Sequence, residues 1–89
     1  MITMHPGKYF DLTVLQTFNM SQANAARRLG VTPATISRFV NGQADLSVEM
    51  ALRLAHVFGR SPESWLRMQL QHTLATKDFS AVLAKLKRM

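Results

Sequence analysis

Hydrophobic positions recur at helical spacing along most of the chain, and short polar signals separate the segments. Ser or Thr precedes four segments, where its hydroxyl can accept a hydrogen bond from a free N–H group of the first helical turn. Glycine follows three segments and can adopt the left-handed conformation that ends a helix. The pattern predicts helices over residues 7–18, 22–29, 33–41, 48–58 and 62–76, with caps at Ser21, Thr32, Ser47 and Ser61 and stops at Gly30, Gly42 and Gly59.

A weaker helical pattern lies in the tail, residues 77–89. Phe79, Val82, Leu83 and Leu86 recur at helical spacing beside basic residues, which is typical of an amphipathic helix. The connections between the predicted helices are too short for another architecture. We therefore expect an all-α fold in which residues 1–76 form one five-helix domain and residues 77–89 form a basic tail with a short sixth helix.

Residues 21–42 have the features of a helix-turn-helix. Such a motif needs small residues where its two helices touch, a glycine in the turn, and apolar residues that hold the second helix in place. These residues are Ala25 and Ala26, then Gly30, and finally Leu29, Val31, Ile36 and Phe39. The motif predicts a domain that binds double-stranded DNA.

The second helix of this motif divides into an inner and an outer arc. At 100° per residue Ile36, Phe39 and Val40 share the inner arc. Arg38 lies on the outer arc and has the chemistry for bidentate contact with guanine, while Gln22 can hold a phosphate at the start of the preceding helix. We predict that the residues in contact with DNA are Gln22, Thr32, Pro33, Ala34, Thr35, Ser37, Arg38 and Asn41. The alternatives are that Thr32 only caps its helix and that Arg38 is only solvated.

Composition narrows the function further. The 89 residues carry 11 Lys and Arg against 5 Asp and Glu, a formal charge of +6 that favours a polyanionic partner. The acidic residues are scattered over different predicted helices, the chain has no Cys, and His56 and His72 lack a ligand partner three or four residues away. We therefore expect a cytoplasmic protein that is not an enzyme, binds no metal or cofactor and does not associate with membranes.

Several short motifs follow one another along residues 5–74. They are His5-Pro6-Gly7, Leu29-Gly30-Val31, Ile36-Ser37, Asn41-Gly42, Met50-Ala51-Leu52-Arg53-Leu54, and Phe58-Gly59 followed by Ser61-Pro62-Glu63 and Trp65-Leu66. In this order they resemble a known family, the HigA-type antitoxins of the Xre/Cro/CI helix-turn-helix superfamily, and the most specific part of the resemblance is the segment from Ser61 to Leu66.

The resemblance implies a lambda-repressor-like fold and a role in a type II toxin-antitoxin system. It implies a homodimer that binds operator DNA, represses its own operon and neutralises a RelE-like (HigB-type) toxin that cleaves mRNA. The alternative is a free-standing Xre-type transcriptional repressor without a toxin.

The apolar surface of the fifth helix suggests a dimer interface at Trp65, Leu66 and Leu70, and the alternative for Trp65 itself is a core residue. The tail could dock on a partner or pack on its own dimer.

Overall fold

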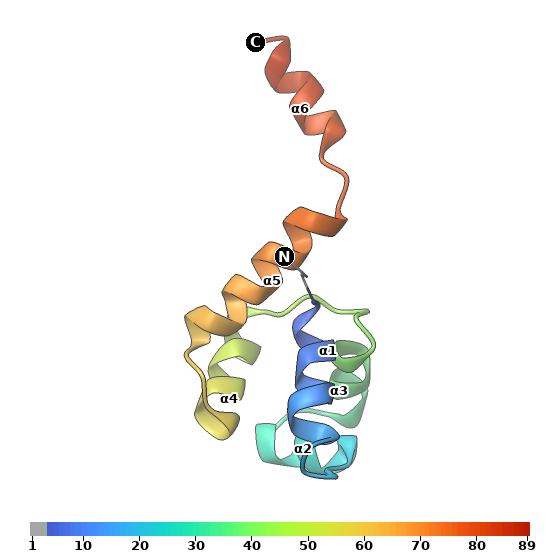
Figure 1. The fold of residues 1–89 in the computed structure, drawn as a ribbon, viewed down its shortest axis with the longest axis vertical. Helices are drawn as coiled ribbons and strands as arrows, with labels where there is room; N and C mark the ends of the chain where they lie inside the picture. The colour runs from blue at the N-terminus through green and yellow to red at the C-terminus, as the bar shows by residue number, and fades with distance from the viewer. Residues whose placement is uncertain (1–3) are drawn as a thin grey trace.

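The computed structural model describes residues 4–89, and all regular structure within them is helical (Figure 1). The predicted all-α class and the short C-terminal helix are confirmed. In chain order the elements are α1 (Pro6–Phe10), the π-helical η1 (Asp11–Leu15), α2 (Gln22–Leu29), α3 (Pro33–Val40), α4 (Val48–Phe58), α5 (Pro62–Thr76) and α6 (Ser80–Lys87).

The four predicted helix caps are confirmed at the starts of α2, α3, α4 and α5. Each hydroxyl accepts a hydrogen bond from the backbone N–H three residues later, at 3.0–3.2 Å. In α3 and α5 the proline after the cap occupies the first helical turn, where its missing N–H is not needed. The helix starts are therefore fixed by local chemistry.

The predicted first helix, residues 7–18, is wrong in its form and its end. The α-helical part is α1, which begins at Pro6 and is capped by His5, and it continues as a π-helix that ends at Leu15. Just after η1, Thr17 Oγ1 donates to the Leu12 carbonyl at 3.1 Å. This hydroxyl competes with backbone N–H donors for a carbonyl of the π-helix. The sequence pattern gave no sign of this widened turn.

All three predicted glycine stops have a positive φ, which glycine adopts more readily than other residues. Gly30 follows α2 with φ 72° and ψ 31°, in the left-handed region, and Gly42 has φ 73°. Gly59 has φ 90° with ψ −170°, so its φ is also positive, although its ψ differs from that of Gly30.

The core lies where α1, α3, α4 and α5 meet, and α2 closes it from one side (Figure 1). Trp65, Phe10, Ile36 and Leu54 are among its largest fully buried side chains. Beyond this core α5 extends outward and leads to α6, which projects away from the other helices and gives the molecule extents of 51 × 25 × 19 Å. Within residues 4–89 no helix combines the length and hydropathy that crossing a membrane requires.

The predicted dimer interface must be corrected at one residue. Trp65 is 1% exposed and its indole N–H donates to the Gly59 carbonyl at 3.1 Å, so its side chain belongs to the core of the single chain. Its ring lies against Tyr9 and Phe10, with ring centroids 5.7 and 6.5 Å away. Leu70 is 56% exposed and Leu66 is half-buried, so these two remain predictions for an interface.

Candidate nucleic-acid interface

The two helices of the motif, α2 and α3, meet through small and apolar side chains. Ala25 is fully buried and Ala26 is 1% exposed, which lets the backbone of α3 approach closely. Ile36 and Phe39 of α3 are 0% and 3% exposed and form its inner arc, as the helical spacing predicted. A larger side chain at Ala25 would displace α3, because the site is already packed at interior density.

The outer arc of α3 and the first residue of α2 face away from the core. Thr35 and Ser37 are half-buried, and the other six predicted DNA-contacting residues are exposed: Gln22, Thr32, Pro33, Ala34, Arg38 and Asn41. All eight lie on α3, on its two flanking residues or at the start of α2. The structure therefore brings the whole predicted set onto the helix-turn-helix.

The polar side chains of this arc differ in how free they are to contact a ligand. Thr32 Oγ1 accepts from the Thr35 N–H at 3.2 Å and shares a second hydrogen bond with Thr35 Oγ1 at 2.9 Å. Ser37 is 3.5 Å from the Asn41 amide nitrogen, a long contact. Among residues 4–89, Arg38 makes no side-chain hydrogen bond or ion pair, so its guanidinium is available.

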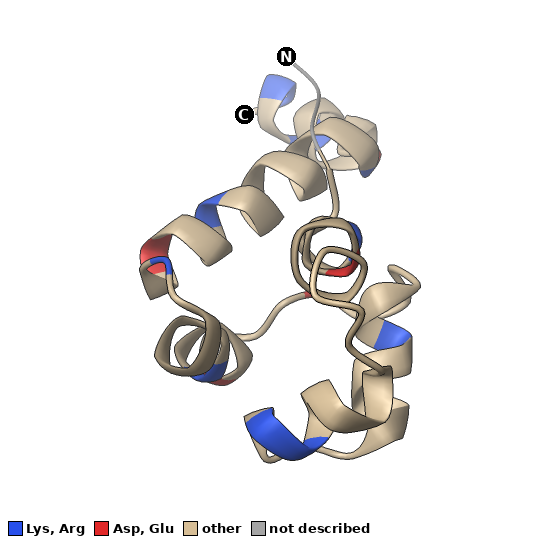
Figure 2. Ribbon diagram, turned by 60° about the horizontal axis from the view of Figure 1, so that its bottom comes forward, with Lys and Arg blue, Asp and Glu red and all other residues tan. Residues whose placement is uncertain are grey.

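The charge of the motif has a single sign. Arg27, Arg28 and Arg38 are the charged residues of segment 21–42, which contains no carboxylate. Over the described chain, basic residues are spread across several helices with few acidic residues among them (Figure 2). Such a surface attracts phosphate without specifying a sequence.

The start of α1 and its capping residue His5 pack against the back of α3. A Cβ added to Gly7 would lie 1.7 Å from the Phe39 carbonyl oxygen, so only glycine lets the α1 backbone approach α3 this closely. The His5 ring lies 5.9 Å from the Phe39 ring, between centroids. The Gly7 N–H donates to His5 Nδ1 at 2.9 Å, so the proton sits on Nε2, which donates to the Ala44 carbonyl at 3.0 Å.

Two of the three histidines, His5 and His72, lie close together in the structure, which the sequence analysis did not predict. His5 is 8% exposed, and its ring centroid is 5.2 Å from that of His72, which is half-buried. Burial lowers the pKa of His5 from its ordinary value of 6.5, against the opposing effect of the Ala44 hydrogen bond. Of the three, His56 alone is exposed.

Sequence reasoning missed a buried amide that fixes the loop after α3. Gln69 on α5 is 7% exposed, and its Oε1 accepts from the Leu46 N–H at 2.9 Å. Its amide nitrogen donates to Thr73 Oγ1 at 2.9 Å and to Asp45 Oδ1 at 3.4 Å. No local pattern indicates the contacts with Leu46 and Asp45, because these residues are 23 and 24 positions away from Gln69 in the sequence.

Comparison with known proteins agrees with this geometry. The helix-turn-helix family model HTH_3 matches residues 14–65. An HTH-type transcriptional regulator of Escherichia coli strain K12, YddM, is 36% identical over 75 residues, which cover 84% of this chain and 80% of YddM.

Two solved structures are similar along most of the chain. The antitoxin GraA is 33% identical with a TM-score of 0.81, covering 85% of this chain and 82% of GraA. The Pseudomonas aeruginosa antitoxin HigA, in a structure with the higBA promoter, is 31% identical with a TM-score of 0.83, covering 98% and 94%. The matched family is a helix-turn-helix family, and these relatives are a transcriptional regulator and two antitoxins, which confirms the predicted resemblance and the prediction that the chain is not an enzyme.

Proposed function

Because this chain belongs to the helix-turn-helix family HTH_3, we propose that it is a repressor that binds double-stranded operator DNA as a homodimer in the cytoplasm. The observation that carries the proposal is the outer arc of α3. This capped helix presents Arg38, which has no hydrogen-bond or ion-pair partner among residues 4–89, beside exposed small and polar residues. Arginine with free N–H groups matches the O6 and N7 acceptors of guanine in the major groove.

The predicted DNA-contacting residues have different proposed roles. Arg38 is the residue for base contact, and Ala34 is small enough to touch a thymine methyl group. Gln22, next to the Ser21 cap, lies at a helix N-terminus whose N–H groups favour a phosphate. Thr32 contributes mainly as the cap of α3, because its hydroxyl is engaged with Thr35.

The dimer follows from the size of one recognition helix. An eight-residue α3 reads only a few base pairs, whereas a twofold pair places two such helices about 34 Å apart on an inverted repeat. HigA of P. aeruginosa was solved with the higBA promoter, and binding of a promoter by this chain would repress its own operon. Leu66 and Leu70 on α5 are the proposed interface residues.

The test is binding of the DNA upstream of the gene, measured by fluorescence anisotropy against a scrambled duplex. Arg38→Ala should lower operator affinity by roughly 1–3 kcal/mol and leave the helical circular dichroism spectrum unchanged, since Arg38 is exposed and unpaired. Affinity should also fall steeply with salt, because phosphate contacts release counterions.

Arg67→Ala is the matched control, because Arg67 is an exposed arginine on α5. It should keep the preference for the operator. If Arg38→Ala discriminates operator from scrambled DNA as well as the wild type does, Arg38 does not read bases. A wild type without any preference would refute the operator-binding function itself.

We further propose that the protein neutralises a RelE-like toxin encoded beside it, as an antitoxin of a type II system. Support comes from the likeness to the antitoxins GraA and HigA and from the tail. All residues from Leu74 to the C-terminus are exposed, including Val82, Leu83 and Leu86, so α6 offers an apolar stripe beside basic residues.

Removal of residues 77–89 tests the role of that stripe. If α6 docks on the toxin, the truncated protein keeps operator binding but loses toxin binding in a pull-down and no longer rescues growth. If α6 packs on its own dimer, truncation raises the dimer dissociation constant in sedimentation. A full-length protein that fails to bind the neighbouring toxin would end the antitoxin assignment.

The second candidate is a free-standing transcriptional repressor. The name of YddM, an HTH-type transcriptional regulator, favours it. This function shares the operator experiment but lacks a toxin gene beside the repressor gene, so inspection of the neighbouring reading frames separates the two.

A further inference from the structure

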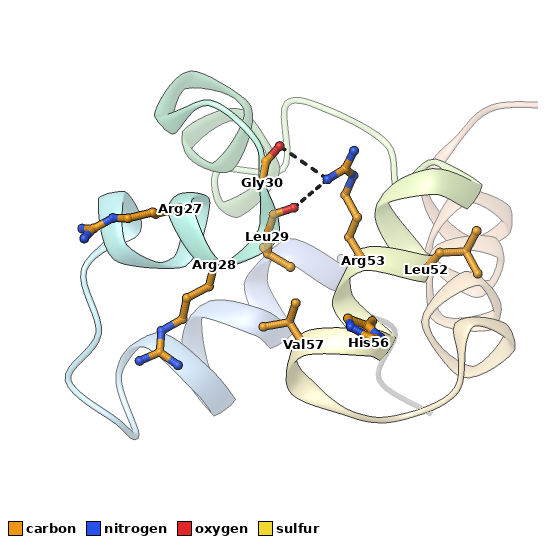
Figure 3. A pocket seen from close by; sticks show the side chains of 8 residues that line it. All are labelled: Arg27, Arg28, Leu29, Gly30, Leu52, Arg53, His56 and Val57. Carbon is orange, nitrogen blue, oxygen red and sulfur yellow. Dashed lines mark hydrogen bonds between the residues drawn. The ribbon is translucent and has the colours of Figure 1, made fainter.

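Arg53 on α4 reaches across to the turn of the helix-turn-helix. Its Nη1 donates to the Leu29 carbonyl at 2.8 Å and lies 3.4 Å from the Gly30 carbonyl (Figure 3). These carbonyls lie at the C-terminus of α2, where the backbone acceptors have no partner within the helix. Arg53 therefore ties α4 to the two residues that lead into α3.

The other side of the guanidinium is held by a carboxylate. Arg53 Nη2 and Nε both donate to Glu49 Oε1, at 2.8 and 3.3 Å. Because Glu49 is one helical turn earlier on α4, it sets the side chain of Arg53 in a fixed direction. The planar fork thus joins three oxygens at once, which the single ammonium of lysine cannot reproduce.

The Arg53 guanidinium also lies close to the turn that leads into the recognition helix, α3. On one side Arg53 lines a groove of about 420 Å³ between α2 and α4, and on the other a hollow of about 210 Å³ shared with Thr35 of α3. A Cβ on Gly30 would lie 2.9 Å from Arg53 Nη1, so the guanidinium is packed directly on the turn. Any movement of the turn relative to α4 must break these contacts.

We propose that Arg53 is a positioning residue for sequence-specific DNA binding, which fixes the angle at which α3 is presented to the major groove. This inference rests on the proposed operator binding. The core contacts of α4 through Ala51 and Leu54, both fully buried, remain when Arg53 is replaced, so the fold survives while the turn loses its anchor. Base contacts need correct geometry, whereas non-specific phosphate contacts tolerate a shifted helix.

The experiment compares Arg53→Met, Arg53→Lys and Arg27→Met with the wild type, using the upstream operator and a scrambled duplex at several salt concentrations. Arg27 lines the same groove but points away from it (Figure 3) and, among residues 4–89, makes no side-chain hydrogen bond or ion pair. Arg27→Met therefore removes an equal charge without touching the turn. Circular dichroism and urea unfolding establish that each variant is folded under the binding conditions.

Both Arg53 variants should lower the ratio of operator to scrambled affinity by about tenfold, a size typical for residues that act on binding from outside the contact surface. The salt dependence should stay that of the wild type. Arg27→Met should keep the ratio.

Three results would overturn the inference. If Arg53→Lys keeps the wild-type ratio, charge alone matters. If the salt slope falls by about one, Arg53 is a phosphate contact. If the variants lose stability yet keep the wild-type ratio, Arg53 is purely structural. A wild type without operator preference would instead refute the proposed function.

Discussion

The helix-turn-helix and the tail contain helices of equal length that are held in different ways. The helices α2, α3 and α6 each have eight residues. The first two begin with a side-chain cap and bury residues such as Ala25, Ile36 and Phe39, whereas α6 lacks a side-chain cap and contains no buried residue. An isolated helix of this length is marginal in water, so packing on the core stabilises α2 and α3, whereas α6 has no such packing within residues 4–89.

The largest expected effect separates these two regions directly. Ile36→Ala should lower the free energy of unfolding by roughly 2–5 kcal/mol, because it opens a cavity at a fully buried position. Leu83→Ala, at a side chain that is 55% exposed, should change it by less than about 0.5 kcal/mol in the monomer. Urea unfolding at low protein concentration measures both.

Repeating both unfolding measurements at higher protein concentration tests whether dimerisation stabilises α6. If the cost of Leu83→Ala grows as protein concentration rises, α6 gains its stability in the dimer. If the two substitutions cost the same at low concentration, the contrast drawn between the regions is wrong.

A smaller effect tests how closely α1 backs the recognition helix. Gly7→Ala should destabilise the fold by roughly 1–3 kcal/mol, because the new methyl group would overlap the Phe39 carbonyl. Ala84→Gln also enlarges a side chain, but on exposed α6, and should be nearly neutral. Thermal unfolding compares them, and equal melting temperatures would show that α1 moves aside freely.

The smallest effect is a pH dependence between pH 5.5 and 7.5, which arises from His5 on the helix-turn-helix side. Because the pKa of folded His5 lies below its ordinary 6.5, the unfolded chain binds the proton more readily. The contribution of His5 to stability is complete above pH 6.5 and is lost as pH falls below that value. Protonation would also place a proton on Nδ1, where the Gly7 N–H now donates.

Unfolding free energies at pH 7.5 and 5.5 measure this effect. His5→Gln should reduce the difference, whereas His56→Gln, at an exposed position, should keep it. His72 and Asp45 also face His5, so His72→Gln is a useful third variant. The tail has no histidine, so truncation of residues 77–89 should leave the difference intact; an unchanged pH response in His5→Gln would refute the role of His5.

The sequence predicted those features that depend on a few neighbouring residues. Caps such as Ser21 and Thr32 act within three positions, and the start and end of α2, α4 and α5 agree with the prediction. The inner and outer arcs of α3 also follow from helical geometry. The site residues Gln22 and Arg38 could be proposed for the same reason, because their place on a helix determines which way they face.

Features that depend on the tertiary fold could not be predicted. Whether Trp65 is in the core or at an interface depends on which rings surround it, and here Tyr9 and Phe10 do. The meeting of His5 with His72 joins the two ends of the domain. For Arg53, the spacing to Glu49 is a visible sequence signal, but the contact with the Leu29 carbonyl is not.

The division of α3 into two arcs has a consequence for how such a protein diversifies. Stability resides in Ile36 and Phe39, while Ala34 and Arg38 are exposed and contribute little to the core. After a gene duplication, the outer residues of each copy can therefore change one at a time while every variant still folds. The two proteins can then acquire separate operators and no longer compete for the same DNA. The same separation makes the outer arc a practical place to graft a new DNA preference onto this scaffold.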